Sequence, residues 1–444
     1  MYGRGARGGC ARLTRTPSDE GALMPQLPRD TRPDATLSLL ADPYRFISKQ
    51  CRAYGSDLFE TRLMLQKATC MTGPEAARLF YDQSRFMRHG AMIGRIQKTL
   101  LGKHGVQGLD DEAHRLRKQM FMSLMTPERI EVLMAITAEE WQARARLWAL
   151  RNEIVLYDEL HELLTRAACA WAGVPLPESQ VRQRTHEITA LFDAAGSVGP
   201  AHWRARWARK RADRWIENIV GRIRSGQIRP PEGSAASIIA EHRGSNGELL
   251  SPHVAAVELL NVIRPIVAVG VYITFVAHAL HQFPECRRKL EAGDDTSFTE
   301  MFVQEVRRFY PFFPAVAALV RRDFEWGGYR FPRGRRVILD LYGTNRDART
   351  WDEPEAFQPE RFRKWDGNPF NFIPQGGGDH DLDHRCPGEW ITIGLMSQAT
   401  KVLSRHIEYD VPEQDLRIDY SRLPALPRSR FIICRVKENA NDPI

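Results

Sequence analysis

The chain of 444 residues is 43% hydrophobic and 27% charged, as in an ordinary soluble globular protein of one large domain or two to three smaller ones. Its formal charge of +8 is modest for this length, so it permits attraction to acidic ligands or anionic surfaces but does not establish nucleic-acid binding. The seven cysteines are scattered without a Cys-x-x-Cys pair, which argues against a disulfide framework and favours a reducing, cytoplasmic location.

Residues 1–23 differ in composition from the rest of the chain. They hold four arginines, five glycines and few large apolar residues, which is typical of disorder. An Arg-rich transit peptide is the alternative, and Met24 is a second candidate for the translation start. Since no repeat or linker divides the remainder, we expect a disordered basic extension over residues 1–23 and a single domain over residues 24–444.

Most of the chain has the apolar spacing of helices. Apolar residues recur at three- and four-residue intervals over 117–124 and 127–148. Ser251-Pro252 predicts a helix start, with Ser251 as the N-terminal cap, and the helix should end before Phe283. The apolar run 265–280 within it is too short and too interrupted for a membrane span. We therefore expect a buried core helix and no transmembrane segment.

The segment 203–215 is strongly basic and has three interleaved tryptophans. The expected structure is a solvated basic helix whose tryptophans pack inward. A basic surface that steers anionic ligands, or meets a lipid surface, is a second interpretation. Nucleic-acid binding is a third and weaker one.

The second half of the chain combines helices with short strands. Ser297 and Glu300 form a predicted capping box for the next helix. Two aromatic segments within 324–331, joined by a Gly-Gly pair, predict a hairpin, and 337–341 predicts another strand. The segment 389–402 then predicts an amphipathic helix.

Cys386 lies in a glycine-rich loop, directly after His384 and Arg385 and before Pro387-Gly388. The glycines permit tight turns close to a flat cofactor, and adjacent positive charge favours a thiolate over a thiol. Three interpretations remain open on local chemistry: a buried structural cysteine, a haem-thiolate ligand, and a zinc site. The crowding of zinc ligands into one short loop makes the zinc site weak. Its ligands would be His380, Asp381, His384 and Cys386.

A second set of residues bears on this choice. Glu305 and Arg308 have the spacing of a pair on one helix face, and Pro-Glu-Arg361-Phe follows before the cysteine loop. Glu-x-x-Arg, then Pro-Glu-Arg-Phe, then Cys-Pro-Gly, in that order, resembles the cytochrome P-450 superfamily. The resemblance implies a mainly α fold with a small β-sheet region, haem b bound through Cys386, and a buried triad of Glu305, Arg308 and Arg361.

The helix expected over the haem departs from oxygen-using members of that superfamily. An acidic residue followed by Thr delivers protons there, whereas this chain has Arg264-Pro265. Arg264 cannot donate a proton at ordinary pH, and an Arg in such apolar surroundings needs an anion. This arrangement resembles the fatty-acid peroxygenase branch. It implies a long-chain fatty acid whose carboxylate pairs with Arg264 as the acid–base group, and hydrogen peroxide in place of dioxygen and a reductase.

The resemblance to that branch covers roughly residues 37–435 and implies further cofactor contacts. His384 should meet a haem propionate, as should His114 and Lys118, although Lys118 replaces the usual Arg. Asp379 stands where the wider superfamily has Phe, so the loop departs from the general pattern.

Gln107 bears on the reaction outcome. Hydroxylases of the branch typically carry Gln at this position, and decarboxylases that form terminal alkenes can carry His. Because Gln107 is neutral, hydroxylation at the α or β carbon is favoured over decarboxylation. A non-catalytic haem- or lipid-binding sensor is the alternative outside the enzymes.

Overall fold

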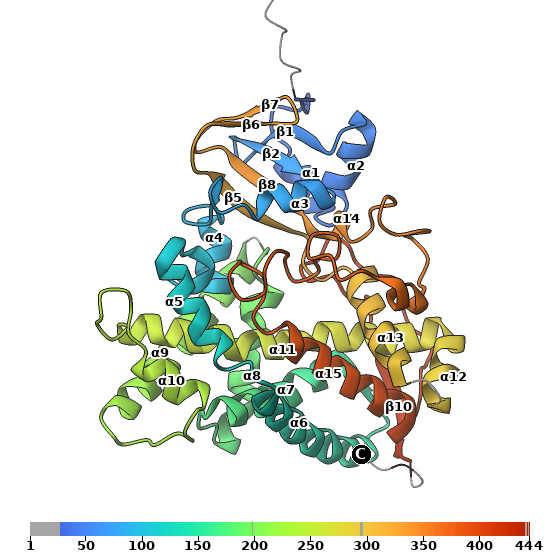
Figure 1. The fold of residues 1–444 in the computed structure, drawn as a ribbon. Coiled ribbons are helices and arrows are strands. Elements are labelled where there is room, and N and C mark those ends of the chain that lie inside the picture. The colour runs from blue at the N-terminus through green and yellow to red at the C-terminus, as the bar shows by residue number, and fades with distance from the viewer. Residues whose placement is uncertain (1–26, 198, 294–295, 440–441, 443) are drawn as a thin grey trace, which may run out of the picture.

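The computed structural model describes residues 27–197, 199–293, 296–439, 442 and 444, so the predicted extension at 1–23 lies outside the described residues. Helices form most of the molecule, and a smaller sheet region lies in the upper part of Figure 1. The predicted fold class, mainly α with a small β-sheet region, is confirmed.

The helices surround one long central member. They are α1 Thr36–Ala41, α2 Phe46–Tyr54, α3 Pro74–Phe80, α4 Gly94–Ile96, α5 Asp111–Met122, α6 Pro127–Trp148, α7 Leu156–Ala172, α8 Val181–Asp193, α9 Pro200–Arg224, α10 Ala235–Glu241, α11 Pro252–Gln282, α12 Pro284–Ala292, α13 Thr296–Phe309, α14 Leu341–Thr344 and α15 Glu389–Lys401. Short 3-10 helices are η2 Val106–Gly108, η3 Glu178–Gln180 and η4 Pro359–Lys364, and short π-helices are η1 Gln97–Leu101 and η5 Val402–His406.

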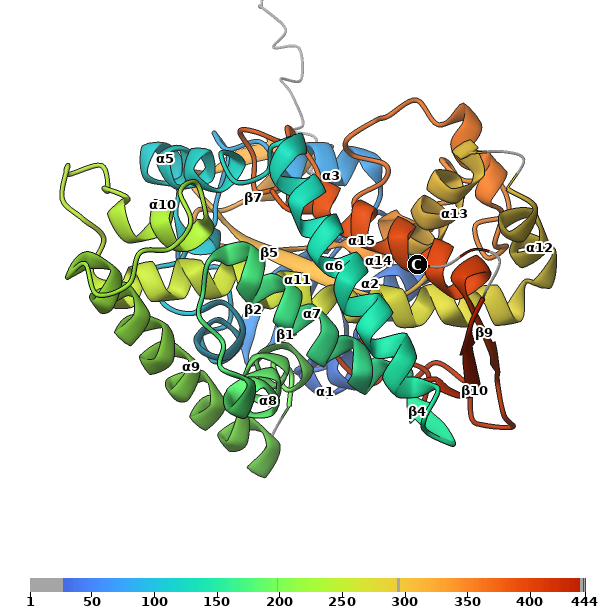
Figure 2. The same cartoon turned by 90° about the horizontal axis from the view of Figure 1, so that it is seen from below.

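The central helix α11 has the predicted bounds. The Ser251 side chain caps it by accepting from Val254 N, and the helix stops at Gln282, before Phe283-Pro284. Helices α7, α9 and α15 pack against it, as Figure 2 shows from below. Among the described residues it is the one helix long and apolar enough to cross a membrane, but 94% of its most apolar window is buried inside the protein. It is therefore the core helix that the sequence predicts.

The strands form three small sheets. The five-stranded sheet has the order β1-β2-β8-β5-β3, in which β2 and β8 are parallel and the other pairs antiparallel. The predicted hairpin is confirmed as β6–β7. The strands are β1 Leu58–Leu63, β2 Gln66–Met71, β3 Phe86–Met87, β4 Glu153–Val155, β5 Ala315–Val320, β6 Phe324–Trp326, β7 Tyr329–Phe331, β8 Arg336–Asp340, β9 Ile407–Asp410 and β10 Ile432–Glu438. The third sheet has the order β4-β10-β9.

Two helix and strand boundaries differ from prediction. The strand expected to reach Leu341 ends at Asp340, because the Asp340 carboxylate caps α14 by accepting from Gly343 N at 2.7 Å. Helix α13 begins at Thr296, so Ser297 lies within its first turn and not at the N-cap position.

The tryptophans of α9 also differ from prediction. Trp215 is half-buried and packs on the core, as expected, but Trp203 and Trp207 are 65% and 61% exposed. The buried side of α9 is instead lined by small side chains, among them Ala205, Ala208 and Ala212. Alanines let the α9 backbone approach its neighbours closely, and two indole rings would prevent that approach.

Candidate active site

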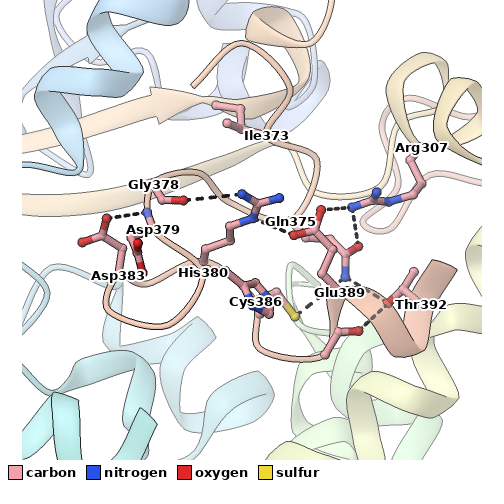
Figure 3. Close-up of polar contacts among 12 residues, drawn as sticks. Arg307, Ile373, Gln375, Gly378, Asp379, His380, Asp383, Cys386, Glu389 and Thr392 are labelled. Carbon is pink, nitrogen blue, oxygen red and sulfur yellow. Dashed lines mark hydrogen bonds and ion pairs between the residues drawn. The ribbon is translucent and has the colours of Figure 1, made fainter. Parts of the chain in front are cut away.

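The loop before α15 holds Cys386 by its backbone. Cys386 N donates to Gln375 O at 3.1 Å, and the Gln375 side chain donates from Nε2 to Thr392 Oγ1 at 3.0 Å. Gly377 is needed for this path, because a Cβ there would lie 2.6 Å from Pro369 O. Figure 3 shows Cys386 and Gln375 facing each other across the loop, with the Gln375 amide 3.7 Å from the sulfur.

A buried ion cluster lies behind this loop. Arg307 of α13 pairs with Glu389, the first residue of α15, and donates to Gln375 Oε1 at 3.0 Å. Arg385 donates to the other Glu389 oxygen at 2.6 Å. The two arginines hold the pKa of Glu389 at about 2 against its burial. Sequence reasoning missed this cluster, although Arg307 lies within the Glu-x-x-Arg motif and Glu389 directly follows Cys-Pro-Gly.

The predicted triad is brought together. Arg308 makes a bidentate pair with Glu305 at 2.6 and 2.8 Å, and Arg361 Nε lies 3.3 Å from Glu305 Oε1. Gln358 N donates to the same carboxylate at 2.7 Å, and Arg308 donates to three backbone carbonyls of the segment 345–356. Glu305 and Arg308 are fully buried. The triad therefore ties α13 to the chain that leads into the cysteine loop.

The electrostatics around Cys386 differ from the expectation of a cation-stabilised thiolate. Burial raises the pKa of the Cys386 thiol, and the Glu389 carboxylate acts in the same direction. The Gly388 amide, Lys118 and Arg307 favour the thiolate but do not outweigh burial. Burial also drives the pKa of His384 well below its usual range, so His384 adds little positive charge beside the sulfur. A bound metal ion would therefore contribute more than these neighbouring groups to keeping the sulfur deprotonated.

The zinc interpretation is wrong. Within the described residues no three His, Cys, Asp or Glu side chains converge as a metal site would require. His380 Nε2 instead lies 3.1 Å from the carbonyl oxygen of Cys386, where it supports the loop.

Arg264 is a buried cation without a carboxylate partner among the described residues. Its Nη2 donates to Asn261 Oδ1 at 3.1 Å, and its Nε has no hydrogen-bond partner. Burial lowers the pKa of Arg264 to about 9, the charge of Arg209 lowers it further, and Cys386 acts in the opposite direction. Arg264 in α11 therefore lies close enough to Cys386, just before α15, for the charge of the sulfur to raise the pKa of the guanidinium. Pro265 follows inside α11 without ending the helix.

Asn261 links Arg264 to the predicted outcome residue. The Asn261 amide donates to Gln107 Oε1 at 3.3 Å and to Glu258 Oε2 at 2.9 Å, while Glu258 forms a buried ion pair with Arg117. Sequence reasoning missed Asn261, Glu258 and Arg117. Their signal was present, since polar residues at 258, 261 and 264 recur every three positions in an otherwise apolar helix.

The predicted propionate ligands lie together beside the loop that holds Cys386. The rings of His114 and His384 stack at 3.8 Å, and Lys118 donates to the carbonyl oxygens of Asp383 and Arg385. Arg88, which the sequence did not single out, lines a small cavity with His384. Neither Lys118 nor Arg88 has a carboxylate within ion-pair distance among the described residues.

These residues fit haem b. Burial lowers the pKa of Lys118 to about 8 and that of His114 to about 4, and the His114 Nδ1 atom is buried without a partner. Lys118 and Arg88 are cations without paired anions, and the His114 imidazole beside them is unsatisfied. These groups suit the two carboxylates at the edge of haem b. Cys386 would supply a sulfur ligand to its iron.

Comparisons with known proteins agree with this arrangement. A family model described as Cytochrome P450 matches residues 288–434. Among solved structures, Cytochrome P450SP alpha (CYP152B1) in complex with (R)-ibuprophen is 58% identical, with a TM-score of 0.90 over 91% of this chain and 99% of that chain. Cytochrome P450EX alpha (CYP152N1) with myristic acid is 44% identical over 93% and 99%, and a variant of cytochrome P450 OleT with arachidonic acid is 35% identical over the same shares, both with TM-scores of 0.90.

Matches to curated relatives are shorter. The first of them, cytochromes P450 from plants, rodents and Mycobacterium tuberculosis, are 25% to 29% identical. The chain spans only 27% to 47% of their length.

The fold and the cysteine loop define a haem-thiolate oxidoreductase, and the chain belongs to the cytochrome P450 family. Within that family it groups with the fatty-acid peroxygenase branch, to which the three solved structures belong.

Proposed function

We propose that this protein hydroxylates long-chain fatty acids at the α or β carbon with hydrogen peroxide as the oxidant. The observation that carries the proposal is Arg264, a buried guanidinium without a carboxylate partner among the described residues. A substrate carboxylate would supply the missing anion in bidentate geometry. The solved structure of Cytochrome P450EX alpha contains myristic acid, which supports a fatty acid as the substrate class.

The chain would hold its cofactor and substrate with separate sets of residues. Cys386 is proposed as the residue that would hold the haem iron through its sulfur, and His114, Lys118 and His384 as partners of the propionates. When bound, the haem supplies the iron at which peroxide is activated and a substrate C–H bond is oxidised. Arg264 would fix the substrate carboxylate, so that only the carbons nearest to it come within reach of the iron.

Proton transfer would rely on the substrate. Arg264 and Pro265 offer no titratable acid or alcohol where other members of the superfamily carry one. The carboxylate held at Arg264 takes a proton from hydrogen peroxide on one oxygen and returns it to the leaving oxygen. One peroxide oxygen enters the C–H bond and the other leaves as water, so no reductase and no further electron donor are needed.

Gln107 supports hydroxylation over loss of the carboxyl group. Its Oε1 already accepts from Asn261, and the amide carries no titratable proton. It therefore positions the polar network beside Arg264 without acting as an acid. Pro265, the residue after Arg264, has no hydroxyl group that could compete with the substrate carboxylate in proton transfer.

Two further parts of the proposal concern the chain as a whole. We place it in the cytoplasm, which the six free cysteines among the described residues support. We also propose that residues 24–444 act as one domain.

The test is product analysis with one saturated long-chain acid, hydrogen peroxide and no reductase. The wild type should give the 2- or 3-hydroxy acid, and Arg264→Ala should abolish the product while haem content is unchanged. Arg115→Ala, an exposed arginine on α5, is the control and should stay active. Full activity of Arg264→Ala would refute the carboxylate role. A terminal alkene as the main product would identify a decarboxylase, and haem binding without any product would identify a sensor.

A further inference from the structure

Helix α9 carries an exposed face on which tryptophans and cations occur together. The helix lies at the lower left edge of the molecule in Figure 2. Its exposed side chains repeat at the three- and four-residue spacing that places residues on one side of a helix. We define the α9 face by these six residues: Trp203, Arg204, Trp207, Lys210, Arg211 and Arg214.

The positive charge of this face is largely uncompensated. Within the described residues, Arg204, Lys210 and Arg214 have no carboxylate within ion-pair distance. Arg211 pairs with Glu187 at 2.7 Å, but Glu187 also pairs with Arg184 at 2.8 Å, so this group of three keeps one positive charge. The face therefore attracts anions.

The two exposed indoles give the face an apolar component. Trp203 and Trp207 lie one turn apart near the start of α9, and both rings are more than half exposed. Lys210 Nζ lies 5.3 Å from the centre of the Trp207 ring, so cation and ring are presented together. Two large rings in water are unfavourable in an isolated protein, and such patches mark interaction surfaces.

We propose that the α9 face docks on the surface of an anionic lipid bilayer. Indoles settle at the headgroup level, where the ring is apolar and its N–H remains hydrated, and flanking cations pair with anionic headgroups. A nucleic-acid backbone is the less suitable occupant, because phosphate contacts would use the cations and leave the indoles uncovered. Docking would bring the enzyme to the phase in which long-chain fatty acids concentrate.

Vesicle binding of the haem-loaded enzyme tests the charge component, without substrate or peroxide, so that its outcome is independent of the proposed function. The wild type should sediment with vesicles of phosphatidylcholine and phosphatidylglycerol, and only weakly with phosphatidylcholine alone. Arg204→Glu/Lys210→Glu/Arg214→Glu should reduce partitioning by at least about tenfold. The control Arg322→Glu/Arg333→Glu/Lys401→Glu makes the same charge change at exposed cations on other elements and should have a much smaller effect.

The tryptophan component has its own test. Bromine-labelled acyl chains quench only indoles that enter the interface, so the quenching should disappear in Trp203→Ser/Trp207→Ser. Leu147→Ser/Leu150→Ser changes two exposed apolar residues of the α6 end and should leave it intact. The proposal is overturned if the wild type does not bind anionic vesicles, if both charge variants lose binding equally, or if the enzyme binds a DNA duplex more tightly than vesicles.

Discussion

Arg264 and Asn261 lie one turn apart on α11, and the Arg264 guanidinium donates from Nη2 to Asn261 Oδ1 at 3.1 Å. The same Asn261 side chain donates its amide hydrogens to Gln107 and Glu258. One asparagine thus orients the cation proposed to hold the substrate and the neutral amide proposed to influence the outcome. The far end of this network is the buried Glu258–Arg117 ion pair, which restricts the movement of the network.

Asn261→Leu should weaken substrate positioning without removing the cation. The variant loses the acceptor that holds Arg264 Nη2, and a hydrogen bond to a charged group is worth roughly 1.5–3 kcal/mol. We expect the KM for a long-chain acid to rise by about tenfold or more, with haem content unchanged. Steady-state kinetics with peroxide measure this. Asn152→Leu, an exposed asparagine, is the control, and an unchanged KM for Asn261→Leu would contradict the positioning role.

Glu305→Gln should strongly destabilise the fold. Arg308 and Arg361 share the Glu305 carboxylate, and its loss leaves buried positive charge uncompensated. Breaking a buried ion pair from one side costs about 3–5 kcal/mol. Urea denaturation of the holoenzyme measures the change in the free energy of unfolding. Glu325→Gln, at an exposed position of β6, should change it by less than about 0.5 kcal/mol.

Local sequence signals predicted the elements that position the site. Ser251-Pro252 and Phe283-Pro284 predicted both ends of α11, because capping and proline geometry depend on neighbouring residues alone. The triad of Glu305, Arg308 and Arg361 came from the resemblance to the cytochrome P-450 superfamily, which the order of these motifs before Cys386 indicated. The roles of these residues toward haem and substrate remain predictions.

Features that depend on packing could not be predicted. Arg307 and Glu389 are 82 residues apart, and only the fold shows that they pair. Burial, which no local pattern reveals, lowers the pKa of His384 well below its usual range. Apolarity predicts Trp203 and Trp207 on the inner side of α9, whereas close helix packing selected Ala205, Ala208 and Ala212 for that side.

Glu389→Gln should change the charge near Cys386, and with it the reduction potential, but should leave the sulfur of Cys386 bound to the metal. Arg307 and Arg385 would keep a hydrogen-bond acceptor but lose the negative charge they share. Removing that charge near the metal favours the reduced state, so the reduction potential should shift upward. Spectroelectrochemical titration measures the shift, with Glu360→Gln at an exposed position as the control. A downward shift, or loss of the thiolate-type ferrous carbonyl spectrum, would contradict this account of the cluster.

Asp340 should make the stability of the fold depend on pH near neutrality. Burial raises the pKa of Asp340 to about 7 from its ordinary value of 3.8, and its Oδ2 atom has no hydrogen-bond partner. Because the folded-state pKa is the higher one, the stabilising contribution is complete below the unfolded-state value and is lost as pH rises through about 7. The shift of about three pKa units corresponds to roughly 4 kcal/mol.

Asp340→Asn should remove this dependence. The amide oxygen can still accept from Gly343 N and cap α14, but the side chain no longer ionises. Denaturation series between pH 5 and about 8 should therefore give a flatter profile for the variant than for the wild type. Asp366→Asn, in the turn before the cysteine loop, keeps an exposed capping group and serves as the control. Parallel profiles for wild type and Asp340→Asn would show that Asp340 is already ionised in the folded protein at the lower end of this range.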